Sequence, residues 1–136
     1  DRPLHIGIIG SSFSVGVGVG RQAPFIGDKE ERATHRYSTL LQELLNRDKQ
    51  KIHHKGIKVD NLARGGCATR CWLNGLHAVK AAKPVPDLVI AEMIMDIAWI
   101  PQPEEFQELL VQMLAMRIPT VFMTGFMTHS KKRHLG

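Results

Sequence analysis

LHIGIIG, residues 4–10, is a short apolar run with three isoleucines and a closing glycine. A run of this kind, without a regular alternation of polar side chains, is typical of a strand that is buried on both faces of a parallel sheet. Gly10 at its end suits a turn that leaves the sheet. We therefore predict a buried parallel strand over these residues, followed by a loop.

Three further segments of the same character supply the other predicted strands: GIKVDNLA (56–63), PDLVIAEMI (86–94) and IPTVFMTGF (118–126). The stretches between them have apolar residues at the 3.6-residue spacing of a helix. This spacing occurs after Tyr37, again through Trp72, and most clearly over 102–116, where Pro103 suits the first helical turn. Strands that alternate with helices in this way predict an α/β fold with a parallel sheet between two helical layers.

The composition indicates one globular domain over residues 1–136. The hydrophobic share of 43% and the charged share of 23% are those of an ordinary folded protein, and the length allows a core. No apolar run reaches the roughly 20 residues of a membrane-spanning helix. The net charge is +5, but the basic residues are scattered and aromatic residues make up only 6%. Nucleic-acid binders gather both on one face, so we expect no nucleic-acid partner.

The cysteines and histidines do not form a metal-binding pattern. Cys67 and Cys71 are spaced so that their side chains can meet on a helix, but a zinc site needs two further ligands. We interpret them as small buried or half-buried residues, and a disulfide between them stays open. His5, His35 and His77 have no companions at metal spacing. We therefore expect no metal site.

In a parallel α/β sheet the ligand site lies outside the carboxyl ends of the strands. The segment SSFSVGVGVG, residues 11–20, follows the first of these ends. It has neither the lysine of a Walker loop nor the G-x-G-x-x-G spacing of a dinucleotide fingerprint. Two adjacent serines, Ser11 and Ser12, stand instead at the strand exit, where a nucleophile could lie.

Three strand exits together resemble the SGNH, or GDSL-type, hydrolases. GSSFSVG (10–16) corresponds to the family's G-D-S-L-x-x-G block, with Ser12 at the nucleophile position and Ser11 in place of the usual aspartate. NLARGG (61–66) is similar to the N-x-G-x-x-G turn, and puts Gly66 at the position whose backbone N–H binds the oxyanion. PDLVIAEMIMDIA (86–98) is similar to the third block, and puts Asp96 where the family has asparagine.

The resemblance implies a flavodoxin-like three-layer fold and an ester hydrolase that works through an acyl-serine intermediate. Ser12 would attack the ester carbonyl, and the backbone N–H groups of Ser12 and Gly66 would bind the oxyanion. The substrate would be a small-molecule, lipid or carbohydrate ester. No cofactor is implied.

Two departures from the family set limits on this interpretation. Asp96 has no N–H to donate, and an ionised carboxylate would repel the oxyanion. The late D-x-x-H block, which holds the catalytic histidine in the family, does not occur in the sequence. We therefore expect a domain that is incomplete at its C-terminus and cut short at about four strands. Its last strand would be an unpaired edge, open to self-association or to another chain.

Other interpretations stay open. Ser12 could be a capping residue and Asp96 an ordinary loop carboxylate. The chain could then be a catalytically inactive SGNH-fold fragment that serves as a binding module. It could also bind a nucleotide or phosphate through residues 11–20 acting as an anion nest. Glu92 and Asp96 do not suit a glycosidase, because four residues along a strand separate them by about 13 Å.

Overall fold

The computed structural model describes residues 1–10, 36–47, 52–64, 69–96 and 103–127. Its centre is a four-stranded parallel sheet with the order β2-β1-β3-β4. The strands are β1 (Leu4–Ile9), β2 (Ile57–Asn61), β3 (Leu88–Asp96) and β4 (Thr120–Met127). The four strands predicted from the apolar runs, and their parallel arrangement, are confirmed.

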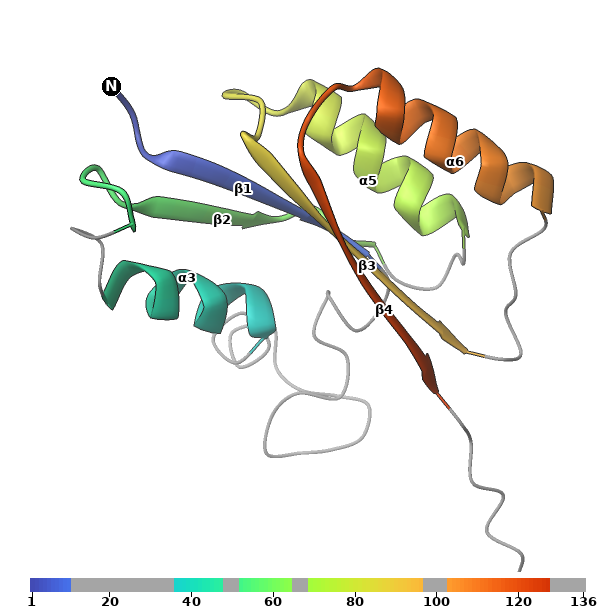
Figure 1. Ribbon diagram of the computed structural model, residues 1–136, viewed down its shortest axis with the longest axis horizontal. Coiled ribbons are helices and arrows are strands. Elements are labelled where there is room, and N and C mark those ends of the chain that lie inside the picture. The colour runs from blue at the N-terminus through green and yellow to red at the C-terminus, as the bar shows by residue number, and fades with distance from the viewer. Residues whose placement is uncertain (11–35, 48–51, 65–68, 97–102, 128–136) are drawn as a thin grey trace, which may run out of the picture.

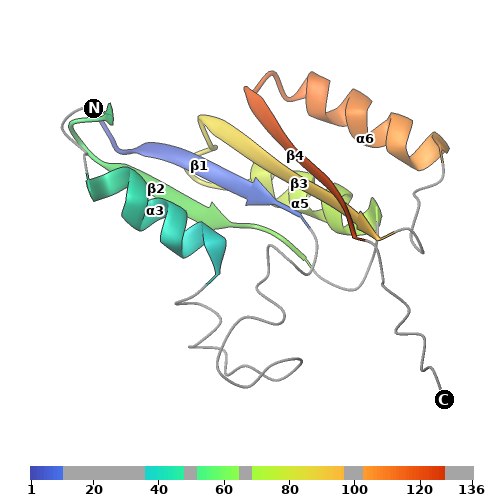
Figure 2. The ribbon, with the colours of Figure 1, turned by 60° about the horizontal axis from the view of Figure 1, so that its bottom comes forward.

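Helices cover both faces of the sheet, as predicted. They are α3 (Tyr37–Arg47), α5 (Thr69–Ala81) and α6 (Pro103–Ala115). α5 and α6 lie together on one face, and α3 lies on the other, beside β2 (Figures 1 and 2). The molecule is therefore a small three-layer α/β domain of the flavodoxin-like kind.

The main core lies between the sheet and the α5–α6 layer. The sheet contributes alternate residues of β3 together with Ile9, and the helices contribute Trp72, Leu76, Val79, Leu109 and Met113. All of these are at most 4% exposed. Burying one such side chain stabilises the fold by about 1.5–3 kcal/mol relative to leaving it in water. The alternation along β3 sends Val89, Ala91 and Met93 to this core and the residues between them to the α3 face.

α5 approaches β1 closely at Gly75. A Cβ atom at this position would lie 2.8 Å from both Cβ and Cγ2 of Ile9. Those atoms sit at the base of a β-branched side chain that is 0% exposed, so they cannot move aside without a shift of the strand. The absence of a side chain at Gly75 therefore sets the distance between helix and sheet.

We expect Gly75→Ala to destabilise the fold by about 1–2 kcal/mol, because an overpacking cost of up to about 3 kcal/mol outweighs the roughly 1 kcal/mol that alanine gains over glycine in a helix. The measurement is urea unfolding followed by circular dichroism. Asn74→Ala is the matched control, because Asn74 is exposed on the same helix and should unfold at or above the wild-type midpoint. A Gly75→Ala protein as stable as Asn74→Ala would contradict this account of the helix–sheet contact.

Candidate functional site

The strand order identifies where a ligand would bind. The chain leaves β1 through α3 on one face and reaches β2, whereas α5 and α6 cover the opposite face on the way to β3 and β4. Connections from β1 and β3 thus leave in opposite directions, and a switch point lies between these two neighbouring strands. The candidate site is the carboxyl end of the sheet at β1 and β3.

Of the predicted site residues, Asp96 ends a strand at this end of the sheet, and the other two follow such strand ends in the sequence. Ser12 and Gly66 lie outside the described residues; Ser12 is the third residue after the end of β1, and Gly66 is the fifth after the end of β2. Asp96 is the last residue of β3 and pairs with Met127 of β4. Only the backbone of Asp96 is described, so the role of its carboxylate stays a prediction.

The described strands limit how far apart these three positions can lie. Asn61, at the end of β2, pairs with Ile8 of β1, whereas Asp96 lies five residues, about 17 Å, beyond Ala91, the partner of Ile9. An extended chain covers at most about 3.6 Å per residue, which limits Ser12 to about 11 Å from Ile9. A meeting of the three positions stays a prediction.

Glu92 is a buried carboxylate at the same switch point. It lies one residue beyond Ala91, the partner of Ile9 in the last β1–β3 pair, and is 0% exposed. Since Ala91 faces α5 and α6, the Glu92 side chain points toward the opposite face of the sheet. Buried ionisable groups cluster at functional sites, which makes Glu92 a candidate site residue. Its position inside an apolar strand was the signal for this, but the sequence analysis set Glu92 aside.

The first turn of α5 contacts the backbone of β3 at Glu92. The indole Nε1–H of Trp72 donates a hydrogen bond of 2.7 Å to the backbone carbonyl of Glu92. Trp72 is 3% exposed, in agreement with its predicted packing role. Its neighbour Cys71 is 1% exposed and disulfide-bonded, so it is a buried residue as predicted but not a free thiol; Cys67 lies outside the described residues.

Arg36 lies immediately before α3, at the carboxyl end of the sheet. The carbonyl of Arg36 accepts backbone N–H bonds from Thr39 and Leu40, and so begins the helix. Its guanidinium Nε is buried and has no hydrogen-bond partner among the described residues. A guanidinium with an unused N–H is suited to hold a carboxylate or another acidic group.

The opposite, amino-terminal end of the sheet holds a cluster of polar groups that tie the strands together. His5, 2% exposed, places Nε2 2.6 Å from Oδ2 of Asp60 and Nδ1 3.0 Å from the carbonyl oxygen of Pro84. Both ring nitrogens are therefore engaged, and neither is free to act on a substrate. Spacing along the sequence gives no sign of these contacts of His5, because Asp60 and Pro84 are distant from it in the chain.

Asp87 belongs to the same cluster. Its carboxylate accepts two hydrogen bonds from the guanidinium of Arg2, of 2.6 and 2.8 Å, and one of 2.9 Å from the backbone N–H of His5. These donors, Arg2 first, hold the pKa of Asp87 below its ordinary value. The group links the N-terminal segment to the start of β3.

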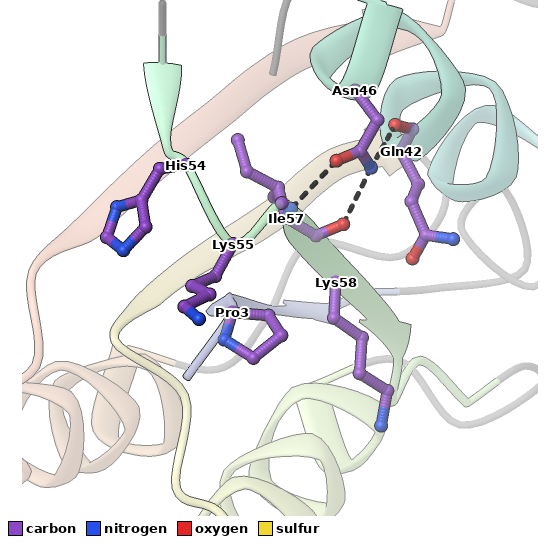
Figure 3. Close-up of a pocket in the computed structure, with 8 residues that line it drawn as sticks. Pro3, Gln42, Asn46, His54, Lys55, Ile57 and Lys58 are labelled. Atoms are coloured by element: carbon purple, nitrogen blue, oxygen red, sulfur yellow. Dashed lines mark hydrogen bonds between the residues drawn. The ribbon is translucent and has the colours of Figure 1, made fainter. Parts of the chain in front are cut away.

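Near this end, α3 and β2 enclose an open hollow of about 370 Å³ (Figure 3). Its polar groups are occupied in holding the fold. The amide of Asn46 bonds both the N–H and the carbonyl of Ile57, Lys58 lies 3.2 Å from Asp60, and Lys55 lies 3.5 Å from Asp1. The hollow is thus remote from the strand exits, and its lining favours a structural role.

Neither a metal site nor a membrane span was found in the described parts of the chain. No three of their histidine, cysteine, aspartate and glutamate side chains gather as metal ligands would. Among the described helices, none is both long and apolar enough to cross a bilayer.

Comparison of the sequence with protein-family models, with curated proteins and with solved structures found no match. The likeness of the three strand-exit segments to SGNH hydrolases therefore rests on those segments and stays a prediction.

We expect Asp87→Asn to reduce the loss of the free energy of unfolding that accompanies a fall in pH. A carboxyl whose pKa is lowered by folding stabilises the protein above the ordinary aspartate pKa of about 3.9, and this stabilisation is lost as the pH falls through the lower folded value. The asparagine has no such loss. The measurement is the free energy of unfolding between pH 7 and pH 2.

Arg2→Gln serves as the partner control, because it removes the largest cause of the pKa shift and leaves the His5 N–H in place. Both variants should be less stable than wild type at pH 7 and should converge on it toward pH 2. Stability curves that run parallel to wild type throughout would contradict the assignment.

Proposed function

We propose that the chain is an ester hydrolase of the SGNH type, in which Ser12 attacks the carbonyl carbon of a small ester. The observation that supports this most is topological. Of the three segments that resemble the family's motif blocks, GSSFSVG and NLARGG begin at the ends of β1 and β2, and PDLVIAEMIMDIA spans β3. These strands are immediate neighbours in the order β2-β1-β3. A catalytic group shared among three loops requires this neighbourhood, which is also the strand order of flavodoxin-like folds with other activities, so the motif residues carry the specificity of the proposal.

The proposed reaction has ordinary acyl-transfer steps. The Ser12 oxygen forms a bond to the ester carbon, and the carbonyl oxygen gains the negative charge of a tetrahedral intermediate. Backbone N–H groups of Ser12 and Gly66 bind that oxygen. The intermediate collapses with release of the alcohol, and water then hydrolyses the acyl-serine. The base that takes the serine proton is not assigned, because no D-x-x-H occurs in the sequence.

The substrate class follows from the family resemblance and from one structural observation. The resemblance implies a small-molecule, lipid or acetylated carbohydrate ester. Arg36 adds a cation at the carboxyl end of the sheet, with an Nε–H that no described residue accepts. We infer that an ester with a nearby acidic group is preferred over a neutral one, because the guanidinium can bind that group without taking part in the chemistry.

A non-catalytic binding module of the same fold is the second candidate. Two facts favour it: Asp96 occupies the position of a required N–H donor, and the D-x-x-H block is not in the sequence. Removing one oxyanion donor costs about 100–1,000-fold in turnover, and a facing carboxylate adds repulsion. This candidate predicts ester binding without turnover.

Labelling by a fluorophosphonate probe distinguishes the two candidates. We expect the folded wild-type chain to be labelled covalently and Ser12→Ala to lose at least 90% of the label, since the probe reports an activated serine. Ser14→Ala is the matched control, two residues away in the same segment, and should keep its label. A folded wild-type chain that takes no label would exclude the hydrolase and leave the binding module.

The role of Asp96 is tested by two substitutions. Asp96→Asn restores the amide donor and should raise the labelling rate by about 100-fold or more. Asp96→Ala removes the negative charge without supplying a donor, so its rate should lie between wild type and Asp96→Asn. Equal rates for all three proteins would show that this position does not face the oxyanion.

A further inference from the structure

The two edges of the sheet differ in how their backbone groups are satisfied. At β2 the outer edge is closed by side chains of α3. Asn46 accepts the N–H of Ile57 at 2.8 Å and donates to its carbonyl at 2.7 Å, and Gln42 accepts the N–H of Val59 at 2.7 Å. These two amides replace a neighbouring strand, so β2 cannot add one without losing them.

At the outer edge of β4 the described residues provide no such cover. Val89 donates its N–H to Pro119, and the β3–β4 register then directs the odd-numbered residues of β4 to β3 and the even-numbered ones outward. Within the described residues, no strand or side chain bonds the outward backbone groups of Thr120, Phe122 and Thr124. Three alternate residues therefore offer donors and acceptors to a further strand.

The side chains of β4 also suit a dry contact. Val121, Phe122 and Met123 are 49%, 46% and 38% exposed. Since successive residues of a strand point to opposite faces, apolar surface is open on both sides of this edge. The strand TVFMTGFM contains no charged residue and no proline, the two devices that most often block an edge.

α6 extends this surface and gives it a polarity. It is the outer helix of its layer, on the β4 side of the sheet (Figure 2). Val111 and Leu114 are 58% and 79% exposed on it. Glu104 and Glu105 make its first turn acidic, and the exposed Arg117 follows its last turn. One end of this helix is thus negative and the other positive.

We propose that a second copy of this chain pairs with β4 edge to edge, antiparallel and about a two-fold axis, so that two four-stranded sheets become one. A closed dimer made from one kind of edge must run antiparallel. The two α6 helices then lie on the same face in opposite directions. The acidic end of each helix approaches the Arg117 end of the other, while Val111 and Leu114 lie between these ends.

The charge pattern selects this occupant. In antiparallel pairing opposite charges meet at both ends of the helix pair, whereas a parallel arrangement would bring like ends together. The contact between the two β4 strands brings no charged side chains together, because β4 contains none. The net charge of +5 on each chain therefore does not oppose it at this edge. One strand edge with one helix face is at the small end of specific interfaces, about 1,200 Å² in total, so a Kd in the micromolar range is expected.

The test is the mass of the whole chain in solution, measured by analytical ultracentrifugation from about 1 to 500 μM. Thr124→Pro removes an outward N–H that β3 does not use, and Phe122→Lys puts a charge on the edge. Each should weaken dimerisation at least tenfold. Leu40→Lys is the matched control, because Leu40 is 51% exposed on α3 and far from β4, and it should dimerise like wild type.

Charge reversal tests the direction of pairing. Arg117→Glu should weaken the dimer about tenfold, and Arg117→Glu combined with Glu105→Arg should restore it, because opposite ends then attract again. A failure of the double variant to recover overturns the antiparallel arrangement. A wild-type chain that is monomeric at 500 μM overturns the proposal as a whole, and would indicate that some other strand covers this edge. Neither result bears on whether Ser12 reacts.

Discussion

The pairing of β1 with strands on both of its sides is the interaction on which the rest of the structure depends. β1 is bonded to β2 and to β3, and five of its six residues are buried. A strand with apolar side chains on both faces needs cover on both, which is why α3 lies on one side and α5 and α6 on the other. The same central position puts the carboxyl end of β1 at the switch in strand order. Ser12, the proposed nucleophile, follows that end by three residues in the sequence.

The two ends of the sheet have different roles. At the amino-terminal end, His5, Asp60, Arg2 and Asp87 satisfy one another and join segments that are far apart in the chain. At the carboxyl end lie the buried Glu92 and a guanidinium N–H that nothing described uses. Polar groups with complete partnerships stabilise a fold, whereas a guanidinium N–H that no described residue accepts is suited to bind an acidic group.

The fold by itself does not select an activity, since parallel α/β sheets carry many unrelated functions. The proposal of an ester hydrolase therefore rests on the residues at the exits, and the topology supports it by bringing those exits to neighbouring strands. Asp96 is the position at which the chemistry and the family resemblance disagree. A carboxylate there works against an oxyanion, so catalysis and binding make opposite demands on this residue.

The sequence by itself determined the four strands, the three helices and the parallel α/β class, because these depend on local apolar periodicity. The Gly75 contact, the partners of His5 and the strand order required the tertiary structure, because they join residues up to 82 positions apart. The same holds for the sheet edges: nothing local distinguishes β2 from β4, yet Asn46 and Gln42 close one and leave the other open. For the candidate site, the sequence proposed Ser12, Gly66 and Asp96, and only the folded sheet brought Glu92 to their end of it, because burial is a property of packed neighbours.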